Sequence, residues 1–188
     1  MPINNFEKVH ENKLNCWAYS AEIFRTIFTL SFIKHLFVLP AFYIFNYTRG
    51  QRLANIGKGC HISPTVLMRC PERIYIGDNC LLNHNNVLQA GKKTGVIRLG
   101  NYVMVGPNVQ MFAYNHCMDL NGVPMIEQPY IDADIIIEND VWIGAGTTIL
   151  GGAKINKGVV IGAGSVVTGE LPANSICAGV PAKVLKMR

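Results

Sequence analysis

Aliphatic residues recur at every sixth position in the C-terminal half of the chain. The series runs without a slip through Ile137, Ile143, Ile149, Ile155, Ile161 and Val167. Small or β-branched residues stand four positions after the aliphatic ones, as at Val141, Thr147 and Ala153. An α-helix repeats its faces every 3.6 residues and a strand every two, so neither element alone explains a period of six.

The same register appears earlier in the chain, where Gly follows the aliphatic residue and marks a corner. It does so after Ile56, Ile76, Leu99 and Val105. Three hexads would form one triangular coil, with the aliphatic side chains inside and parallel hydrogen bonds between stacked coils. The pattern predicts an all-β fold, a parallel β-helix of hexapeptide repeats over residues 54–172. A β-sandwich would show turn signals about every 8–12 residues instead.

The six-residue period is interrupted between Met111 and Ile137 by a polar, turn-rich stretch. We expect residues 112–136 to protrude as a loop, and loops on a rigid scaffold commonly carry function. This loop contains His116 near its start. An imidazole, with an ordinary pKa of about 6.5, can take a proton from a nucleophile near neutral pH.

The N-terminal segment, residues 1–53, differs from the repeats. Residues 16–47 are dominated by apolar and aromatic side chains at helical spacing, which predicts at least one helix. Arg25 and Lys34 interrupt the run and Pro40 would kink it, which argues against a clean transmembrane span. Two interpretations stay open: a helix that caps the end of the β-helix, or an interfacial anchor that contacts a membrane through residues 16–47.

Composition narrows the class of protein. A length of 188 residues suits one globular unit, followed here by a short C-terminal tail at 173–188. The net charge of +5 is scattered and matches no nucleic-acid-binding module, which favours a small phosphate-bearing ligand over DNA or RNA. Six cysteines without a CxxC pair are typical of reduced thiols in the cytoplasm, and no metal site is expected. An anchored protein would lie at the inner face of the membrane.

Three segments identify a family. The hexads, together with Val141-Trp-Ile-Gly-Ala-Gly, Ile161-Gly-Ala-Gly-Ser-Val-Val-Thr and Ala178-Gly-Val-Pro-Ala-Lys-Val-Leu-Lys, resemble the hexapeptide-repeat acyltransferases over roughly residues 54–188. The likeness is greatest to the branch of galactoside and maltose acetyltransferases and polysaccharide O-acetyltransferases. It implies a left-handed β-helix and a homotrimer with active sites between subunits.

The resemblance also implies a reaction. An acetyl group would pass from acetyl-coenzyme A, a cosubstrate, directly to a sugar hydroxyl in a ternary complex, in bacterial surface polysaccharide biosynthesis. His116 matches the family's general base. An Asn near the acceptor is matched by Asn85, while Asn83 and Asn86 stay open because the following spacer, residues 91–95, differs in length from that of relatives.

Other positions match the family's binding residues. Trp142 corresponds to an aromatic residue near the active site, although it also suits a subunit interface. Tyr114 and Asp119 would orient the imidazole, bind sugar hydroxyls or stabilise the loop, and these alternatives stay open.

The coenzyme positions lie further along the chain. Ala145 and Ala163 stand where relatives let pantetheine run between two prisms, although any tight corner favours small residues. Thr168 matches a contact to the adenosine end, and Lys183 and Lys186 match basic residues beside the coenzyme phosphates.

The fold is also compatible with other functions. The same fold serves carbonic anhydrases, but these need three His ligands to zinc. An N-acetyltransferase for a nucleotide-linked amino sugar and a non-catalytic β-helix scaffold remain alternatives. The identity of the carbohydrate acceptor is left open.

Overall fold

A computed structural model describes residues 16–188, and its contacts divide the chain after Tyr43. The first unit contains α1 (Cys16–Ile27) and α2 (Leu30–Tyr43). The turn between them is closed by the Thr29 hydroxyl, which donates to the Thr26 carbonyl and accepts the Phe32 N–H. The predicted N-terminal segment is thus helical from its first described residue, and residues 1–15 lie outside the described part of the chain.

The second unit begins with η2 (Ile44–Thr48) and α3 (Arg49–Leu53), which end the helical region. Gly50 is buried against β3, where an added Cβ would lie 2.9 Å from the Met68 Cβ. The Gln51 side chain donates to the Ser63 carbonyl at 3.1 Å. Contacts with the β-helix therefore begin before residue 53, the expected end of the helical segment.

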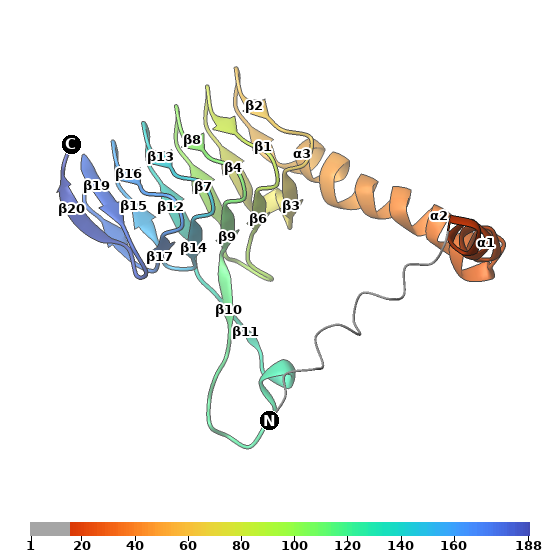
Figure 1. The fold of residues 1–188 in the computed structure, drawn as a ribbon. Helices are drawn as coiled ribbons and strands as arrows, with labels where there is room; N and C mark the ends of the chain where they lie inside the picture. The colour runs from red at the N-terminus through yellow and green to blue at the C-terminus, as the bar shows by residue number, and fades with distance from the viewer. Residues whose placement is uncertain (1–15) are drawn as a thin grey trace, which may run out of the picture. The chain divides into compact units, whose positions relative to one another are not determined.

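The β-helix consists of three sheets, drawn as rows of arrows in Figure 1. The first sheet contains β1 (Asn55–Ile56), β4 (Ile74–Ile76), β7 (Ile97–Leu99), β12 (Ile135–Ile137), β15 (Lys154–Ile155) and β18 (Glu170–Leu171). The second contains β2 (His61–Ile62), β5 (Leu81–Leu82), β8 (Met104–Val105), β13 (Trp142–Ile143), β16 (Val160–Ile161), β19 (Ser175–Ala178) and β20 (Lys183–Met187). The third contains β3 (Leu67–Arg69), β6 (Val87–Gln89), β9 (Gln110–Phe112), β14 (Thr148–Leu150) and β17 (Val166–Val167).

Strand register explains the period of six. Ile137 pairs with Ile155 in the first sheet, and Ile143 pairs with Ile161 in the second. Each pair is three hexads apart, which is one full coil. All members of the aliphatic series are at most 1% exposed and form one continuous core. The predicted parallel β-helix is confirmed.

The corners of the coils require a left-handed backbone. We call them the first corner (first to second sheet), the second corner (second to third sheet) and the third corner (third back to first sheet). At the second corner, equivalent residues of successive coils have φ between 58° and 70°: Asn85, Asn108, Gly146 and Gly164. Glycine and asparagine adopt this conformation at least cost, so the backbone itself accounts for Asn85.

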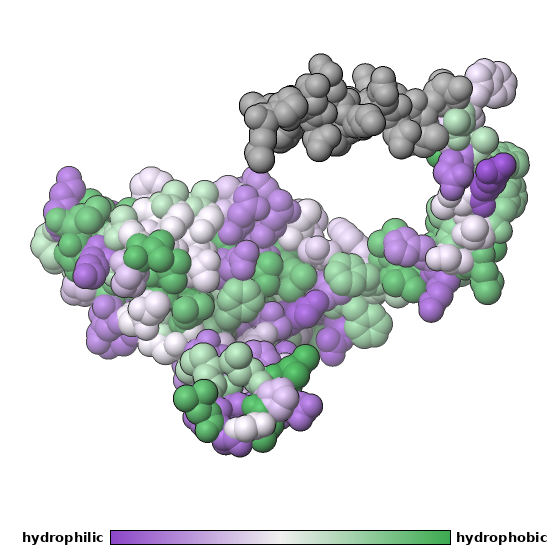
Figure 2. Space-filling model, turned by 60° about the horizontal axis from the view of Figure 1, so that its bottom comes forward, coloured by the Kyte–Doolittle hydropathy of each residue, from purple (hydrophilic) through white to green (hydrophobic). Residues whose placement is uncertain are grey.

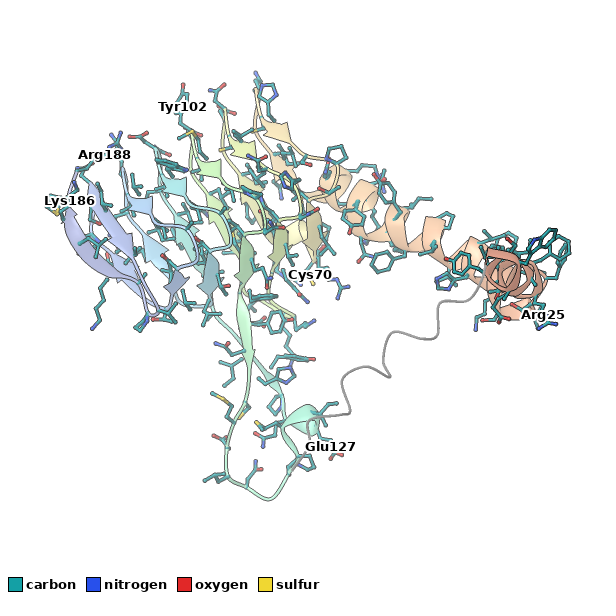
Figure 3. The ribbon with its side chains drawn as sticks, viewed as in Figure 1. Arg25, Cys70, Tyr102, Glu127, Lys186 and Arg188 are labelled. Atoms are coloured by element: carbon teal, nitrogen blue, oxygen red, sulfur yellow. The ribbon has the colours of Figure 1, made fainter. Side chains whose placement is uncertain are left out.

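Insertions gather at the third corner. It carries η3 (Pro71–Arg73), the spacer 91–95 and the interruption between β9 and β12. The interruption, predicted as a loop over 112–136, is a hairpin of β10 (Tyr114–His116) and β11 (Tyr130–Asp132) with η4 (Met125–Glu127) near its tip. Its predicted ends belong to β9 and β12. Figure 3 shows Cys70 on the side from which the hairpin projects and Tyr102 on the opposite edge.

The end of the chain is also ordered. Residues 173–188, expected as a tail, contain β19 and β20, which pair antiparallel and complete the second sheet. The Arg188 guanidinium lies 3.1 Å from the Asp140 carboxylate. The last strand therefore covers the final coil, as α3 covers the first.

Candidate active site

The hairpin brings aromatic side chains onto His116. His116 pairs with Tyr130 across the two strands, and their ring centroids are 4.4 Å apart. Tyr114 meets the same Tyr130 ring edge-on at 5.3 Å. The Lys92 ammonium, from the neighbouring spacer, lies 4.7 Å from the Tyr114 ring centre and 5.1 Å from that of Tyr130. Tyr130 thus fixes the imidazole from one side, within a positively charged aromatic cluster.

The base of the hairpin is fastened by Asp132. Its carboxylate accepts backbone N–H groups from Lys92, Lys93, Thr94 and Gly95 at 2.6–3.1 Å. Partial desolvation alone would raise the pKa of Asp132, but these hydrogen bonds outweigh it and hold the pKa well below its ordinary value. The charged carboxylate ties the spacer to the hairpin and so holds Lys92 beside the aromatic rings.

Gln128 organises the distal half of the hairpin. Its side-chain amide donates to the carbonyls of Asp119 and Val123 at 3.0 and 2.8 Å and accepts the Asp119 N–H. The buried Cys117 thiol donates to the Asp119 carboxylate at 3.1 Å. The described contacts of Asp119 are therefore internal to the loop, which is one of its predicted roles, and Cys117 is a packing residue.

A groove of about 400 Å³ opens beside His116. It is lined by Asn115, His116, Met118, Met125 and Ile126. Its apolar side chains are largely exposed, with Ile126 at 85%, and green patches mark this hairpin where it comes forward in Figure 2. Glu127 is labelled on the same part of the hairpin in Figure 3. The groove offers space for an acceptor within reach of the imidazole.

Trp142 lies away from the hairpin, on the outer face of the second sheet. It pairs with Met104 and Val160 and is 52% exposed. A shallow pocket of about 230 Å³ separates it from Leu81 and Asn83. Trp142 is thus available to a ligand or to another protein surface.

The asparagines of residues 83–86 divide by their contacts. The Asn86 side chain is fully buried, donates to the Asn83 carbonyl and accepts the Val109 N–H at 2.7 Å. It is therefore occupied within the coil. Asn85 has an exposed side chain at the second corner, and Asn83 lines the pocket beside Trp142.

The predicted coenzyme residues form a line along the second corner. Ala163 lies one coil beyond Ala145, and the next residue, Gly164, donates its N–H to the Ala145 carbonyl at 2.8 Å. Lys183 pairs with Ala178 at the end of this line, whereas Lys186 pairs with Ile176 nearer the middle of β20. Figure 3 shows Lys186 at the outer end of the β-helix.

Thr168 does not join this line. It follows β17 and so stands at the third corner, the corner that carries the hairpin. Within one chain, the hairpin with His116 and the line of Ala145 and Ala163 therefore occupy different corners. In the described residues 16–188, no group of three or more His, Cys, Asp or Glu could hold a metal ion.

Sequence reasoning missed Tyr130, Lys92 and Asp132. Their positions depend on the antiparallel register of β10 and β11 and on the spacer that lies against it. The hexad pattern carries no information about either. The only signal for a second strand is the alternation of polar and apolar residues in Tyr130, Ile131 and Asp132, near the end of the interruption.

Comparison with known proteins now identifies the family. The profile for bacterial transferase hexapeptide (six repeats) matches residues 134–169. The maltose O-acetyltransferase of Clostridium difficile 630 superposes with a TM-score of 0.64 and 31% identity, over 73% of this chain and 72% of that one. This chain belongs to the bacterial hexapeptide transferase family.

Further members of the family extend the comparison. A galactoside acetyltransferase solved in complex with coenzyme A gives a TM-score of 0.64 at 30% identity, covering 71% of this chain and 64% of that one. The galactoside O-acetyltransferase of Escherichia coli K12 is 32% identical over 140 residues, which are 72% of this chain and 64% of the relative. This chain thus spans less than two thirds of the E. coli protein. The predicted family and the left-handed β-helix are confirmed.

Proposed function

We propose that this protein transfers the acetyl group of acetyl-coenzyme A to a sugar hydroxyl, with His116 as general base. The observation that carries the proposal is the position of His116. Its ring is held against Tyr130 on a fastened hairpin and borders an open groove. The coenzyme-bound galactoside acetyltransferase and the O-acetyltransferases among the relatives support the class of reaction.

The proposed reaction is a direct transfer. An imidazole nitrogen of His116 takes the proton of the acceptor hydroxyl as its oxygen attacks the thioester carbon. The carbon–sulfur bond breaks, and the departing thiolate takes the proton from the imidazolium. Backbone N–H groups would stabilise the negative oxygen of the tetrahedral intermediate. Tyr130 and Tyr114 keep the ring in place, and an acceptor enters beside Asn115.

The proposed coenzyme site runs along the second corner. Ala145 and Ala163 have no side chain beyond Cβ, so an extended pantetheine arm can approach the backbone closely. Lys183 at the end of the line, with Lys186 beyond it, would meet the phosphates. Thr168 lies at another corner, so it contacts the same coenzyme only if the coenzyme reaches across the third sheet or is shared with a second copy.

We propose a homotrimer because one chain does not bring the two parts of the proposed site together. The hairpin with His116 and the line of alanines lie at different corners of one prism. A neighbouring copy that presents its second corner to the hairpin would complete the site. Trp142, exposed on the second sheet, would then lie at or near the contact between copies.

We place the reaction in the cytoplasm and propose surface polysaccharides or their precursors as acceptors. Among the described cysteines, Cys60, Cys70, Cys80, Cys117 and Cys177 are free thiols, which suits a reducing compartment. The polysaccharide role rests on the resemblance to O-acetyltransferases. An amino sugar acceptor would instead make the enzyme an N-acetyltransferase.

The test is a turnover assay. Wild type and His116→Ala are incubated with acetyl-coenzyme A and a panel of free, nucleotide-linked and lipid-linked sugars, while free thiol and product mass are followed. We expect acceptor-dependent turnover that falls by about 10²–10⁴-fold in the variant. Leu120→Ala, a change at an exposed position elsewhere on the hairpin, is the matched control. Absence of coenzyme binding would favour a non-catalytic scaffold.

A further inference from the structure

The helices before the β-helix expose an unusual amount of apolar surface. Trp17 is 87% exposed, Phe28 70% and Phe37 74%, and α2 contains no buried residue. Green surface gathers in the helical region of Figure 2. Exposed apolar patches of this extent generally mark a binding surface.

The apolar residues of α2 are not confined to one face. At 100° per residue, Ile33, Val38 and Leu39 point in three directions about a third of a turn apart. A helix that is apolar all round needs either a protein interior or lipid around it. The polar residues of α2, Ser31, Lys34 and His35, all lie in its first half, and the second half, from Leu36 to Tyr43, is apolar on every side. A helix docked on one side of a protein partner would keep a polar face along its whole length.

Apart from Glu22 in α1, the charged residues of α1 and α2 are basic, and the chain that follows continues this bias. From residue 23 to residue 71 there is no Asp or Glu, but there are six basic residues, namely Arg25, Lys34, Arg49, Arg52, Lys58 and Arg69. A second copy of this segment would meet its own positive charges, which disfavours self-association. A bilayer that contains anionic lipids offers both hydrocarbon and negative charge.

The length of the apolar run sets how far it can enter. The helical stretch Leu30–Leu53 is long and apolar enough, by length and composition, to cross a membrane. However, α3 packs on β3, and the uncharged part between Lys34 and Arg49 measures only about 21 Å against about 30 Å of hydrocarbon. The run is therefore suited to deep insertion rather than to a clean crossing.

Helix α1 is different and amphipathic. On a helical wheel Trp17, Phe24 and Phe28 share one side, Glu22 lies on the opposite side, and Arg25 lies at the border between the two. An amphipathic helix of this kind lies in the headgroup region, with its aromatic side toward the acyl chains.

We infer that α1 and α2 bind an anionic lipid bilayer, with α1 lying in the headgroup region and α2 inserted among the acyl chains. Because α3 follows α2 and packs on the first coil, insertion would hold the β-helix at the membrane surface. With a cytoplasmic location, that surface is the inner face. This inference does not depend on the acetyl transfer reaction.

Vesicle flotation of the full chain tests the inference. We expect binding to vesicles of phosphatidylcholine with phosphatidylglycerol, and weaker binding to phosphatidylcholine alone. In Trp142→Phe, Trp17 is the remaining tryptophan of the chain. Its emission should shift to the blue on binding and be quenched by brominated lipid. No flotation with either vesicle would overturn the inference.

Matched variants separate insertion from charge. Leu36→Lys in α2 should weaken vesicle binding at least tenfold, whereas Leu120→Lys on the hairpin should not. Lys34→Gln should weaken binding to the anionic vesicles about fivefold and leave binding to phosphatidylcholine unchanged. Two results would contradict insertion. One is vesicle binding by Leu36→Lys that equals that of wild type. The other is a wild-type protein that does not float but forms oligomers without lipid, which Leu36→Lys dissociates.

Discussion

The stacked coils and the inserted hairpin are stabilised in different ways. In the coils, each hexad places an aliphatic side chain such as Ile149 into a core shared with its neighbours. The hairpin has almost no core and is held by hydrogen bonds to two side chains, Asp132 at its base and Gln128 near its tip. The apolar scaffold can therefore remain constant while the polar hairpin changes its chemistry.

The strongest test of this contrast removes a core side chain. Ile149→Ala should lower the free energy of unfolding by about 3 kcal/mol, since it leaves a cavity in a fully buried layer. Thermal melting followed by circular dichroism measures the change. Leu120→Ala, on the exposed hairpin, should alter stability by less than about 0.5 kcal/mol. Equal melting temperatures for the two variants would show that the core is not what stabilises the coils.

A change at the second corner separates a structural asparagine from a candidate binding residue. Asn86→Ala leaves the buried Val109 N–H without its acceptor and should cost about 1–3 kcal/mol. Asn85→Gly should be nearly neutral for stability, because glycine accepts the same left-handed backbone. If Asn85 contacts the acceptor, the second variant melts like wild type but transfers acetyl groups more slowly. Full activity would remove Asn85 from the site.

Substitutions of the hairpin residues that contact His116 should lower turnover rather than stability. Tyr130→Ala removes the ring that holds His116, and we expect kcat to fall about tenfold, equivalent to about 1.4 kcal/mol. Tyr130→Phe keeps the ring and should stay close to wild type. Steady-state kinetics with the best acceptor of the panel measures both. Equal losses in the two variants would point to the phenolic hydroxyl rather than to ring packing.

The smallest expected effect is a pH dependence of the hydrogen bonds that Asp132 accepts at the base of the hairpin. In the folded protein the pKa of Asp132 lies below its ordinary value of 3.8. The charged carboxylate therefore stabilises the hairpin base fully at a pH well above 3.8, and this stabilisation is lost as the pH falls below 3.8 toward the folded pKa. Hydrogen-exchange protection of the amides of residues 92–95, corrected for intrinsic rates, should fall severalfold between pH 7 and pH 3. In Asp132→Asn, protection should already be low at pH 7 and vary little. An equally large fall in that variant would assign the effect to another group.

The sequence determined the β-helix because its signal is repeated. Ile137 and its successors report the same inward position many times, so the period, the parallel stacking and the corners follow from one pattern. The family resemblance added handedness and selected His116, Ala145 and Ala163. At least one helix in the N-terminal segment was also predicted, since an apolar run with helical spacing needs no distant partner to be recognised.

Only the tertiary structure decided what surrounds His116. Tyr130, Lys92 and Asp132 come together through one antiparallel register and one set of hydrogen bonds between an insertion and a spacer. Such contacts occur once and leave no period in the chain. The tertiary structure also placed Thr168 and Ala145 at different corners, because the position of a residue around a coil depends on how many residues each insertion adds. Repeated local contacts can be predicted from sequence, whereas single contacts between insertions depend on the folded chain.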